Sequence, residues 1–419
     1  MRNKIVLLVL AVFVSTITSA NITLPSFFSD NMVLQRNSEV AIWGTAGPNE
    51  EIVIKPSWGK DEYKVKTDRY ANWKILIKTV EAGGPYTISL KGYNEIVLNN
   101  IMLGEVWICA GQSNMEMSAN WGIDNGEEAI KSADYPNIRL FTVPKTTALT
   151  PQNNLSGNWS VCNPETMKNF SAVGYFFAKR LQEDLKGVPI GLISSNWGGT
   201  PAEIWTPEKV ITSDAILCEA AGKLTSFEWG PSEPGRAFNA MISPLVDFKI
   251  AGVLWYQGES NVGSAVYDKT FGSLITSWRR LWNYDFPFYF VQIAPYNYEN
   301  DQYNGAVIRN AQRKTLQQIA NTGMVVTSDI SPTNDIHPKD KKSVGIRLAN
   351  LALANTYKTY KGFVNGPLYR QIKTDGNKLI VSFDYAEGLY FKNKKQYNLR
   401  LPAGMVFFMW LKQRSKIIL

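Results

Sequence analysis

The feature that most constrains the fold is an alternation of short apolar runs with helix-length amphipathic segments between residues 101 and 358. Strands that alternate with helices predict a parallel sheet, because each crossover lays a helix on one face of the sheet. The predicted strands are 106–110, 190–195, 251–256, 288–293 and 324–328, and the predicted helices are 170–185, 266–282, 306–320 and 341–356. The sequence therefore predicts an α/β domain over 101–358 whose sheet is covered on both faces.

Segments of β type flank this domain on both sides. Residues 21–100 hold short β-type runs at 40–44, 51–54, 73–77 and 86–90, separated by turn clusters, and this spacing predicts a small β-sandwich. Short β-like pieces return within 359–391. We therefore expect an N-terminal β domain over 21–100 and an incomplete C-terminal β segment over 359–391.

Residues 1–20 have the pattern of a secretory signal peptide. Arg2 and Lys4 precede an apolar run over 5–14, and small residues at 18–20 offer a cleavage site. The run is short for a bilayer span, and no later stretch reaches about 18 apolar residues. The sequence predicts export to the periplasm or the extracellular space without a membrane span after cleavage; a retained anchor is the alternative.

The formal net charge of +8 suggests a nucleic-acid partner, but its distribution argues against one. Of the 44 Lys and Arg residues, two precede residue 5 and seven follow residue 391, where no acid occurs. The other 35 face 36 acidic residues, so the body of the chain lacks the basic patch that nucleic-acid binding needs.

The basic tail over 392–419 does not resemble the end of a folded domain. Its stretch 399–412 is apolar and basic, which favours aggregation or, alternatively, contact with a membrane surface or a partner. When permitted codons for residues 399–413 are read in a frame displaced by one nucleotide, they can encode a β-strand-like sequence that contains acidic residues. We therefore hypothesise a frameshift near residue 398, which the nucleotide sequence tests.

The chain offers few ligands for metals and no motif for nucleotides. It has one histidine, His337, and three cysteines, whereas zinc and iron sites usually need several imidazoles or thiolates. Neither GxxxxGK[ST] nor a strand-linked GxGxxG occurs. We expect no catalytic transition metal and no cofactor, with Cys109 as a buried thiol and Cys162 and Cys218 as a possible pair.

Polar clusters follow four of the predicted strands. They are Gly-Gln-Ser-Asn-Met at 111–115, Asn-Trp-Gly-Gly-Thr at 196–200, Gln-Gly-Glu-Ser-Asn at 257–261, and Asp329 with Asn-Asp-Ile-His-Pro at 334–338. In a parallel sheet the carboxyl ends of the strands share one edge, where ligands bind. Together the clusters hold the groups that acyl transfer needs: nucleophile, base, acid and oxyanion donors. Ser113 alone could be a helix N-cap, and His337 alone a structural imidazole, but their joint position favours a nucleophile and its base.

The blocks at 111–115, 257–261 and 335–338, with Asp-Asn-Met-Val-Leu-Gln-Arg at 30–36, resemble the sialate O-acetylesterase family of SGNH/GDSL-type serine hydrolases. The resemblance covers roughly 21–391. It implies an SGNH-hydrolase-like three-layer α/β/α fold and a serine esterase that removes O-acetyl groups from sialic acid through an acetyl-enzyme.

The same resemblance implies roles for individual residues. Ser113 would be the nucleophile and His337 the general base. The N–H groups of Ser113 and Gly198 would form the oxyanion hole with the side chain of Gln257 or Asn261.

Two positions depart from the wider superfamily pattern. The acid that orients the histidine usually lies three residues before it, where this chain has Asn334. Asp335 or Asp329 would take that role, and a Ser–His dyad is also possible. The superfamily's usual Asn block is replaced here by Gln-Gly-Glu at 257–259, which leaves the third oxyanion donor open. Glu259 is expected to support the site more than to act as an acid, because supporting groups outnumber catalytic ones.

Three alternatives stay open from the sequence. The first is a glycosidase that uses Glu203 and Glu259 as a carboxylate pair, which leaves the Ser113 and His337 pairing unexplained. The second is an acetylesterase on other carbohydrates, such as acetylxylan. The third is a non-catalytic carbohydrate-binding protein, because tryptophans near the clusters could stack on sugars: Trp121, Trp197, Trp205 and Trp255.

Overall fold

The computed structural model describes residues 21–225, 227–298, 303–376, 378–387, 410–412 and 416–418. The predicted signal peptide and the predicted frameshift point near residue 398 lie outside these residues. Within the described ranges, no helix has both the length and the apolar character needed to cross a membrane.

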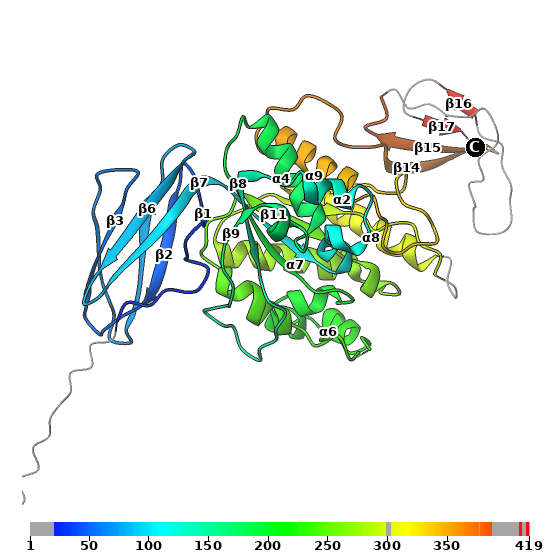
Figure 1. Cartoon of the computed structure of the whole chain (residues 1–419). Helices are drawn as coiled ribbons and strands as arrows, with labels where there is room; N and C mark the ends of the chain where they lie inside the picture. Colours follow the sequence, from blue (N-terminus) through cyan, green and yellow to red (C-terminus); the bar gives the residue numbers. More distant parts are fainter. Residues whose placement is uncertain are drawn as a thin grey trace, which may run out of the picture.

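A long sheet path forms the centre of the protein (Figure 1). Its order is β13–β12–β11–β7–β10–β8–β9, and every pair is parallel except β8 with the edge strand β9. The strands are β7 Glu95–Gly111, β8 Tyr135–Thr142, β9 Ser160–Cys162, β10 Ile190–Asn196, β11 Gly252–Tyr256, β12 Phe288–Val291 and β13 Thr322–Val325. All five predicted strands are present, whereas β8 and β9 were not predicted.

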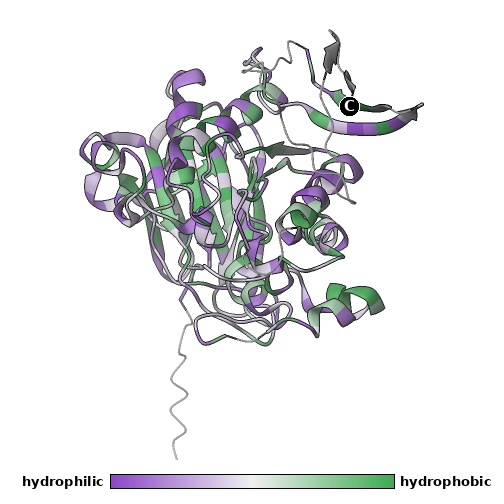
Figure 2. Ribbon diagram, turned by 90° about the vertical axis from the view of Figure 1, so that its right-hand side faces the viewer, coloured by the Kyte–Doolittle hydropathy of each residue, from purple (hydrophilic) through white to green (hydrophobic). Residues whose placement is uncertain are grey.

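Helices cover both faces of this sheet, which confirms the predicted α/β/α fold. The long helices are α4 Ala172–Asp184, α7 Tyr267–Trp282, α8 Asn304–Gln318 and α9 Lys341–Asn355. Along β11, Val253 and Trp255 pack into the cluster that contains the apolar side of α7, while Leu254 and Tyr256 pack into the cluster of α4 and α9. Such alternation follows from the two-residue repeat of a strand, and Figure 2 shows the resulting apolar strands between more polar helices.

Shorter helices connect the strands and carry several of the polar clusters. They are α1 Ser113–Glu116, α2 Gly126–Lys131, α3 Pro164–Met167, α5 Glu208–Thr212 and α6 Ala215–Ala221, with short 3-10 turns at Ala119–Trp121, Ala202–Trp205 and Glu259–Asn261. Because α1 directly follows β7, it begins at the carboxyl edge of the central sheet.

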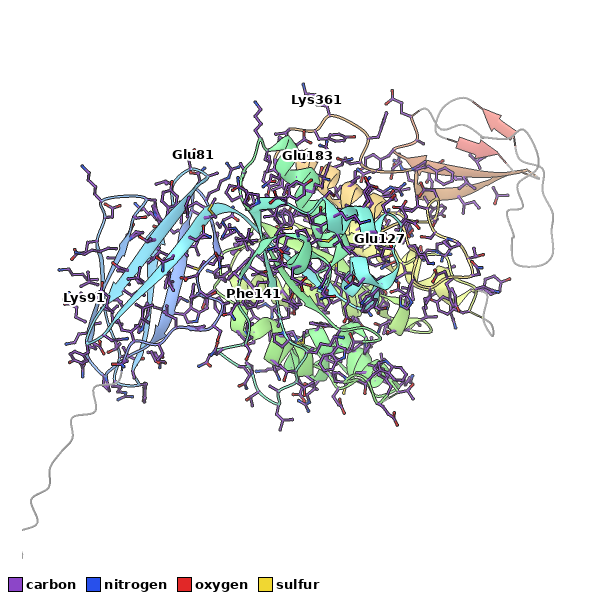
Figure 3. All side chains as sticks on the ribbon, viewed as in Figure 1. Glu81, Lys91, Glu127, Phe141, Glu183 and Lys361 are labelled. Atoms are coloured by element: carbon purple, nitrogen blue, oxygen red, sulfur yellow. The ribbon has the colours of Figure 1, made fainter. Side chains whose placement is uncertain are left out.

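The N-terminal residues form a β domain beside the central sheet (Figure 1). Its strands are β1 Val33–Gln35, β2 Glu39–Thr45, β3 Glu51–Pro56, β4 Tyr63–Lys66, β5 Asn72–Lys78 and β6 Gly83–Lys91. Strands β2 and β5 pair with each other. Strands β1 and β6 pair with the first half of β7, β3 pairs with β6, and β4 pairs with β3. The second half of β7 pairs with β10 and β11, so one continuous strand crosses the predicted boundary at residue 100. Figure 3 labels Glu81 and Lys91 on the outside of this domain and the buried Phe141 of β8.

A small antiparallel sheet follows α9. Its order is β14 Leu368–Asp375, β15 Lys378–Asp384, β17 Lys416–Ile418 and β16 Trp410–Lys412. Part of the predicted aberrant tail therefore pairs with β15.

The three cysteines are free thiols. Cys109 is buried as expected, and burial raises its pKa. The possible disulfide between Cys162 and Cys218 is not formed. Cys162 is buried in the edge strand β9, whereas Cys218 is exposed on α6.

Candidate active site

Ser113 and His337 meet at the carboxyl edge of the central sheet. Ser113 is the first residue of α1, and His337 lies in the loop that precedes α9. The Oγ of Ser113 lies 2.8 Å from the Nε2 of His337, although 224 positions separate them in the chain. This distance is that of a hydrogen bond between a nucleophile and its base.

The loop that carries His337 is held from two sides. The N–H of His337 donates to Oδ1 of Asp335 at 2.8 Å, and the side-chain amide of Asn114 donates to the carbonyl of Ile336 at 3.0 Å. Asp329, the other predicted orienting acid, instead binds Arg347 through both carboxylate oxygens. Of the two carboxylates, only Asp335 contacts the histidine residue.

The environment of His337 favours a neutral imidazole. Burial lowers the pKa of His337, and the positive charge of Lys341 lowers it further, while the Asp335 carboxylate opposes this shift. A neutral imidazole can accept a proton, as a general base must.

We therefore expect the acidic limb of the kcat/KM profile to lie below pH 6.5, the usual pKa of histidine. A lowered pKa keeps the base form populated to lower pH, so activity is lost only when the pH falls through that lowered value. The measurement is the hydrolysis of p-nitrophenyl acetate against pH. In Lys341→Gln the repulsion by the ammonium is gone, so the limb should move to higher pH; a limb at or above 6.5 in the unchanged protein would contradict the prediction.

Asn114 connects the nucleophile's helix to two buried ionisable groups. Its side-chain N–H group donates to Glu259 at 2.6 Å, and its carbonyl oxygen accepts from Nζ of Lys341 at 2.5 Å. Burial raises the pKa of Glu259 and lowers the pKa of Lys341 to about 7. Asp340 caps α9 by accepting from the N–H of Ser343, which fixes where Lys341 begins the helix.

Sequence reasoning missed Asn114 and Lys341, and it left Glu259 between two roles. In the structure the Glu259 carboxylate accepts from the side-chain amide of Asn114, the residue after Ser113, and Glu259 is 8 % exposed. The one sequence feature that could have indicated a role for Asn114 in the site is its position directly after the nucleophile. No spacing pattern could indicate Lys341, because it lies 227 positions away from its partner.

Gly198 lies directly against Ser113. A β-carbon added to Gly198 would lie 3.2 Å from Oε2 of Glu116 and 3.3 Å from the β-carbon of Ser113, so a side chain here would be tightly packed against the nucleophile. The N–H of Gly198, a predicted oxyanion donor, donates to Glu116 at 2.8 Å, and Glu116 also binds Lys145. An acyl oxygen can use this N–H only after the Glu116 carboxylate has moved away.

The predicted third oxyanion donors, Gln257 and Asn261, are engaged elsewhere. The amide nitrogen of Gln257 donates to the carbonyl of Thr200 at 3.2 Å and to Asn261 at 2.7 Å. The amide nitrogen of Asn261 donates to the buried carboxylate of Glu203 at 2.8 Å. These bonds connect the loop after β10 to the loop after β11. In this structure the two side chains therefore stabilise the loops around the site, and their amide nitrogens bind these partners and not a group at Ser113.

The same contacts argue against a glycosidase. Glu203 and Glu259 are 1 % and 8 % exposed, and each carboxylate is bonded to a side-chain amide. A carboxylate pair that cleaves a glycosidic bond must flank the sugar on two sides. Glu203 borders a cavity but Glu259 does not line it, and both carboxylates are held by amides.

Of the four tryptophans considered for sugar stacking, two lie in the core. Trp205 and Trp255 are fully buried and pack edge to face at 6.2 Å. Trp255 lies on β11 and Trp205 ends the turn Ala202–Trp205, and both belong to the hydrophobic cluster that contains the apolar side of α7. Trp121 is 50 % exposed, and Trp197 donates its indole N–H to the carbonyl of Trp229.

Metal ligands do not cluster in the part of the chain that the structure describes: no group of three His, Cys, Asp or Glu side chains there could hold an ion. We predict that exhaustive treatment with EDTA leaves the hydrolysis of p-nitrophenyl acetate unchanged, because Ser113 and His337 already supply a nucleophile and a base. Activity that is lost on chelation and restored by zinc would contradict this prediction.

Comparisons with known proteins agree on one family. Residues 103–354 match the family described as carbohydrate esterase, sialic acid-specific acetylesterase. The chain is 29% identical to sialate O-acetylesterase of Homo sapiens over 407 residues, which cover 88% of this chain and 77% of that protein. The corresponding protein of Mus musculus is 28% identical over 444 residues, covering 91% and 82%. Among solved structures, a carbohydrate acetylesterase from Xanthomonas citri, XAC1771, superposes with a TM-score of 0.83 at 30% identity, covering 95% of this chain and 90% of that one.

Proposed function

Because the chain belongs to the sialic acid-specific acetylesterase family of carbohydrate esterases, and is therefore a carboxylic ester hydrolase, we propose that it removes O-acetyl groups from sialic acid by a Ser–His–Asp mechanism. The observation that carries the mechanism is the 2.8 Å contact between Ser113 Oγ and His337 Nε2. In this mechanism Ser113 is the nucleophile, His337 the general base and Asp335 the acid that orients it.

In the first half of the reaction, Ser113 attacks the acetyl carbonyl carbon. Nε2 of His337 takes the proton from the Ser113 hydroxyl as the new C–O bond forms. The negative charge that develops on the carbonyl oxygen is stabilised by the N–H of Ser113, one of the helix-start donors that have no intrahelical acceptor. The N–H of Gly198 joins it once Glu116 has released that group. Protonated His337 then returns the proton to the departing sugar oxygen, which leaves an acetyl-enzyme.

In the second half, water replaces the sugar. His337 takes a proton from the water as its oxygen attacks the acetyl-enzyme, and the tetrahedral species uses the same oxyanion donors. The C–O bond to Ser113 then breaks, His337 returns the proton to the Ser113 oxygen, and acetate is released.

Sialic acid is favoured as the sugar by the description of the matched family and by the names of the mammalian relatives. A second candidate is acetate removal from other carbohydrates, because XAC1771, a carbohydrate acetylesterase, matches almost the whole chain. The same chemistry serves both substrates. From residues 1–20 we also propose that the enzyme acts after export.

The experiment that tests the function is a panel of substrates assayed for released acetate: O-acetylated sialic acid, acetylated xylo-oligosaccharides and p-nitrophenyl acetate. We expect acetate release from sialic acid, and no release from any substrate by Ser113→Ala. Release only from xylo-oligosaccharides would move the assignment to the second candidate. Ser113-independent hydrolysis, or no hydrolysis of any ester, would contradict the proposed mechanism.

A further inference from the structure

A cavity of about 580 Å³ lies beside the cluster that holds Ser113. It is bounded by α6, labelled in Figure 1, and by the loop that follows β11. Gly199 and Ser260 both line it. Gly199 follows the glycine that lies against Ser113, and the N–H of Ser260 donates to Gln112, the residue before Ser113. Two loops that reach the neighbours of Ser113 therefore also line the cavity, and its volume is in the range of small-molecule sites.

One aromatic ring lines this cavity, and a second ring is stacked on the first. Phe227 lines it, and its ring stacks on that of Trp229 at 5.1 Å with an interplanar angle of 28°. Trp229 is 68 % exposed, although a stacked aromatic pair would normally bury its apolar surface in the core. An exposed aromatic surface next to a reactive cluster is typical of a ligand-binding site.

Contacts with Trp197 and Gly199 hold the loop that carries Trp229 in place. The indole N–H of Trp197 donates to the carbonyl of Trp229 at 2.8 Å. A β-carbon added to Gly199 would lie 2.5 Å from Nε1 of Trp229, so the indole rests on a residue that has no side chain. These contacts connect the aromatic pair to the loop that also brings Gly198 to Ser113.

The charged groups around the cavity already have partners. Lys223 binds Glu219 at 2.7 Å, and the Glu203 carboxylate is bonded to Asn261 and Thr270. Recognition here therefore depends on ring faces and polar rim groups. A pyranose fits this chemistry, because its C–H face packs on the electron-rich face of an aromatic ring while its hydroxyl groups reach the polar rim.

We propose that Phe227 and Trp229, with this cavity, form a subsite that holds a pyranose ring of the acetylated glycan while the acetyl group reaches Ser113. The inference rests on the proposed esterase function and adds the residues that distinguish a glycan ester from a simple acetate ester. Phe227 and Trp229 take no part in the transfer of the acetyl group.

The test compares Trp229→Ala and Phe227→Ala with the unchanged enzyme on O-acetylated sialic acid, acetylated xylo-oligosaccharides and p-nitrophenyl acetate. We expect KM for the hydrolysed glycan to rise about tenfold, equivalent to about 1.4 kcal/mol, with little change in kcat. The kcat/KM for p-nitrophenyl acetate should stay unchanged, which also shows that each variant is folded. Tyr93→Ala is the matched control, because Tyr93 is 67 % exposed on the N-terminal β domain.

Trp229→Phe separates stacking from a structural role, since it keeps an aromatic face and should retain most of the glycan affinity. An unchanged KM for the glycan in Trp229→Ala would overturn the subsite, as would an equal loss for p-nitrophenyl acetate. Failure of the unchanged enzyme to hydrolyse any ester would instead overturn the proposed function, so the two failures are distinguishable.

Discussion

Alanine at His337 is expected to lower kcat about 10³-fold or more, by analogy with the dissection of other serine hydrolase sites. His337 is the single histidine of the chain, and its Nε2 is the group in hydrogen-bond contact with the Ser113 hydroxyl. Without it, no neutral base remains at that position to take the proton as Ser113 attacks. The measurement is kcat for p-nitrophenyl acetate and for an acetylated glycan.

Ser113→Ala should cause a loss of similar size, and the double variant should be no worse than either single variant. Groups that act as one unit in the same step are strongly non-additive. Multiplicative losses in the double variant would mean that the two residues act independently. Near-normal turnover in a folded His337→Ala protein would exclude His337 as the base.

Asp335→Asn is expected to lower kcat about 10²-fold or more, because the acid of a serine hydrolase site stabilises the imidazolium that forms during the reaction. Asparagine keeps a side-chain oxygen that can accept from the N–H of His337, so the loop conformation is preserved. The substitution removes the negative charge that raises the pKa of His337. The acidic limb of the kcat/KM profile should therefore also move to lower pH.

Asp329→Asn is the matched control. Asp329 pairs with Arg347 through both carboxylate oxygens, and this partly exposed ion pair contributes at most about 1 kcal/mol to stability. We expect a change in kcat of less than about threefold, since the Asp329 carboxylate has no contact with the histidine. A large loss in Asp329→Asn with a small one in Asp335→Asn would reverse the assignment, and small losses in both would indicate a Ser–His dyad.

Much of the fold could be predicted because its evidence is local. The strands that became β10 and β11 begin as short apolar runs and are followed by polar residues, and the helix that became α7 has apolar residues at helical spacing. Strands β8 and β9 escaped prediction because β8 mixes charged and apolar residues and β9 has only 3 residues. The boundary placed at residue 100 falls inside β7, since a strand can pass from one sheet to another without a turn in its sequence.

The approximate position of the candidate site could also be predicted from the sequence. Parallel strands bring their carboxyl ends to one edge, so the clusters that follow β7, β10, β11 and β13 had to approach one another. That argument brings Ser113 and His337 together, and the structure has them in hydrogen-bond contact. The order of the strands cannot show which side chains bind each other at this edge of the sheet. The amides of Gln257 and Asn261 face Thr200 and Glu203, and this choice depends on side-chain directions that strand order does not specify.

The sequence by itself determined five strands and four long helices of the central domain, the α/β class and the four polar clusters, because periodicity and turn residues act over a few positions. Only the tertiary structure decided which carboxylate accompanies His337, that Glu116 holds the N–H of Gly198, and that Asn114 joins Glu259 to Lys341. It also decided which aromatic rings are exposed, burying Trp205 and Trp255 and leaving Trp229 exposed against Phe227. The physical reason is chain separation: Asn114 lies 145 positions from Glu259 and 227 from Lys341. Contacts of that range arise from packing, and no local pattern encodes them.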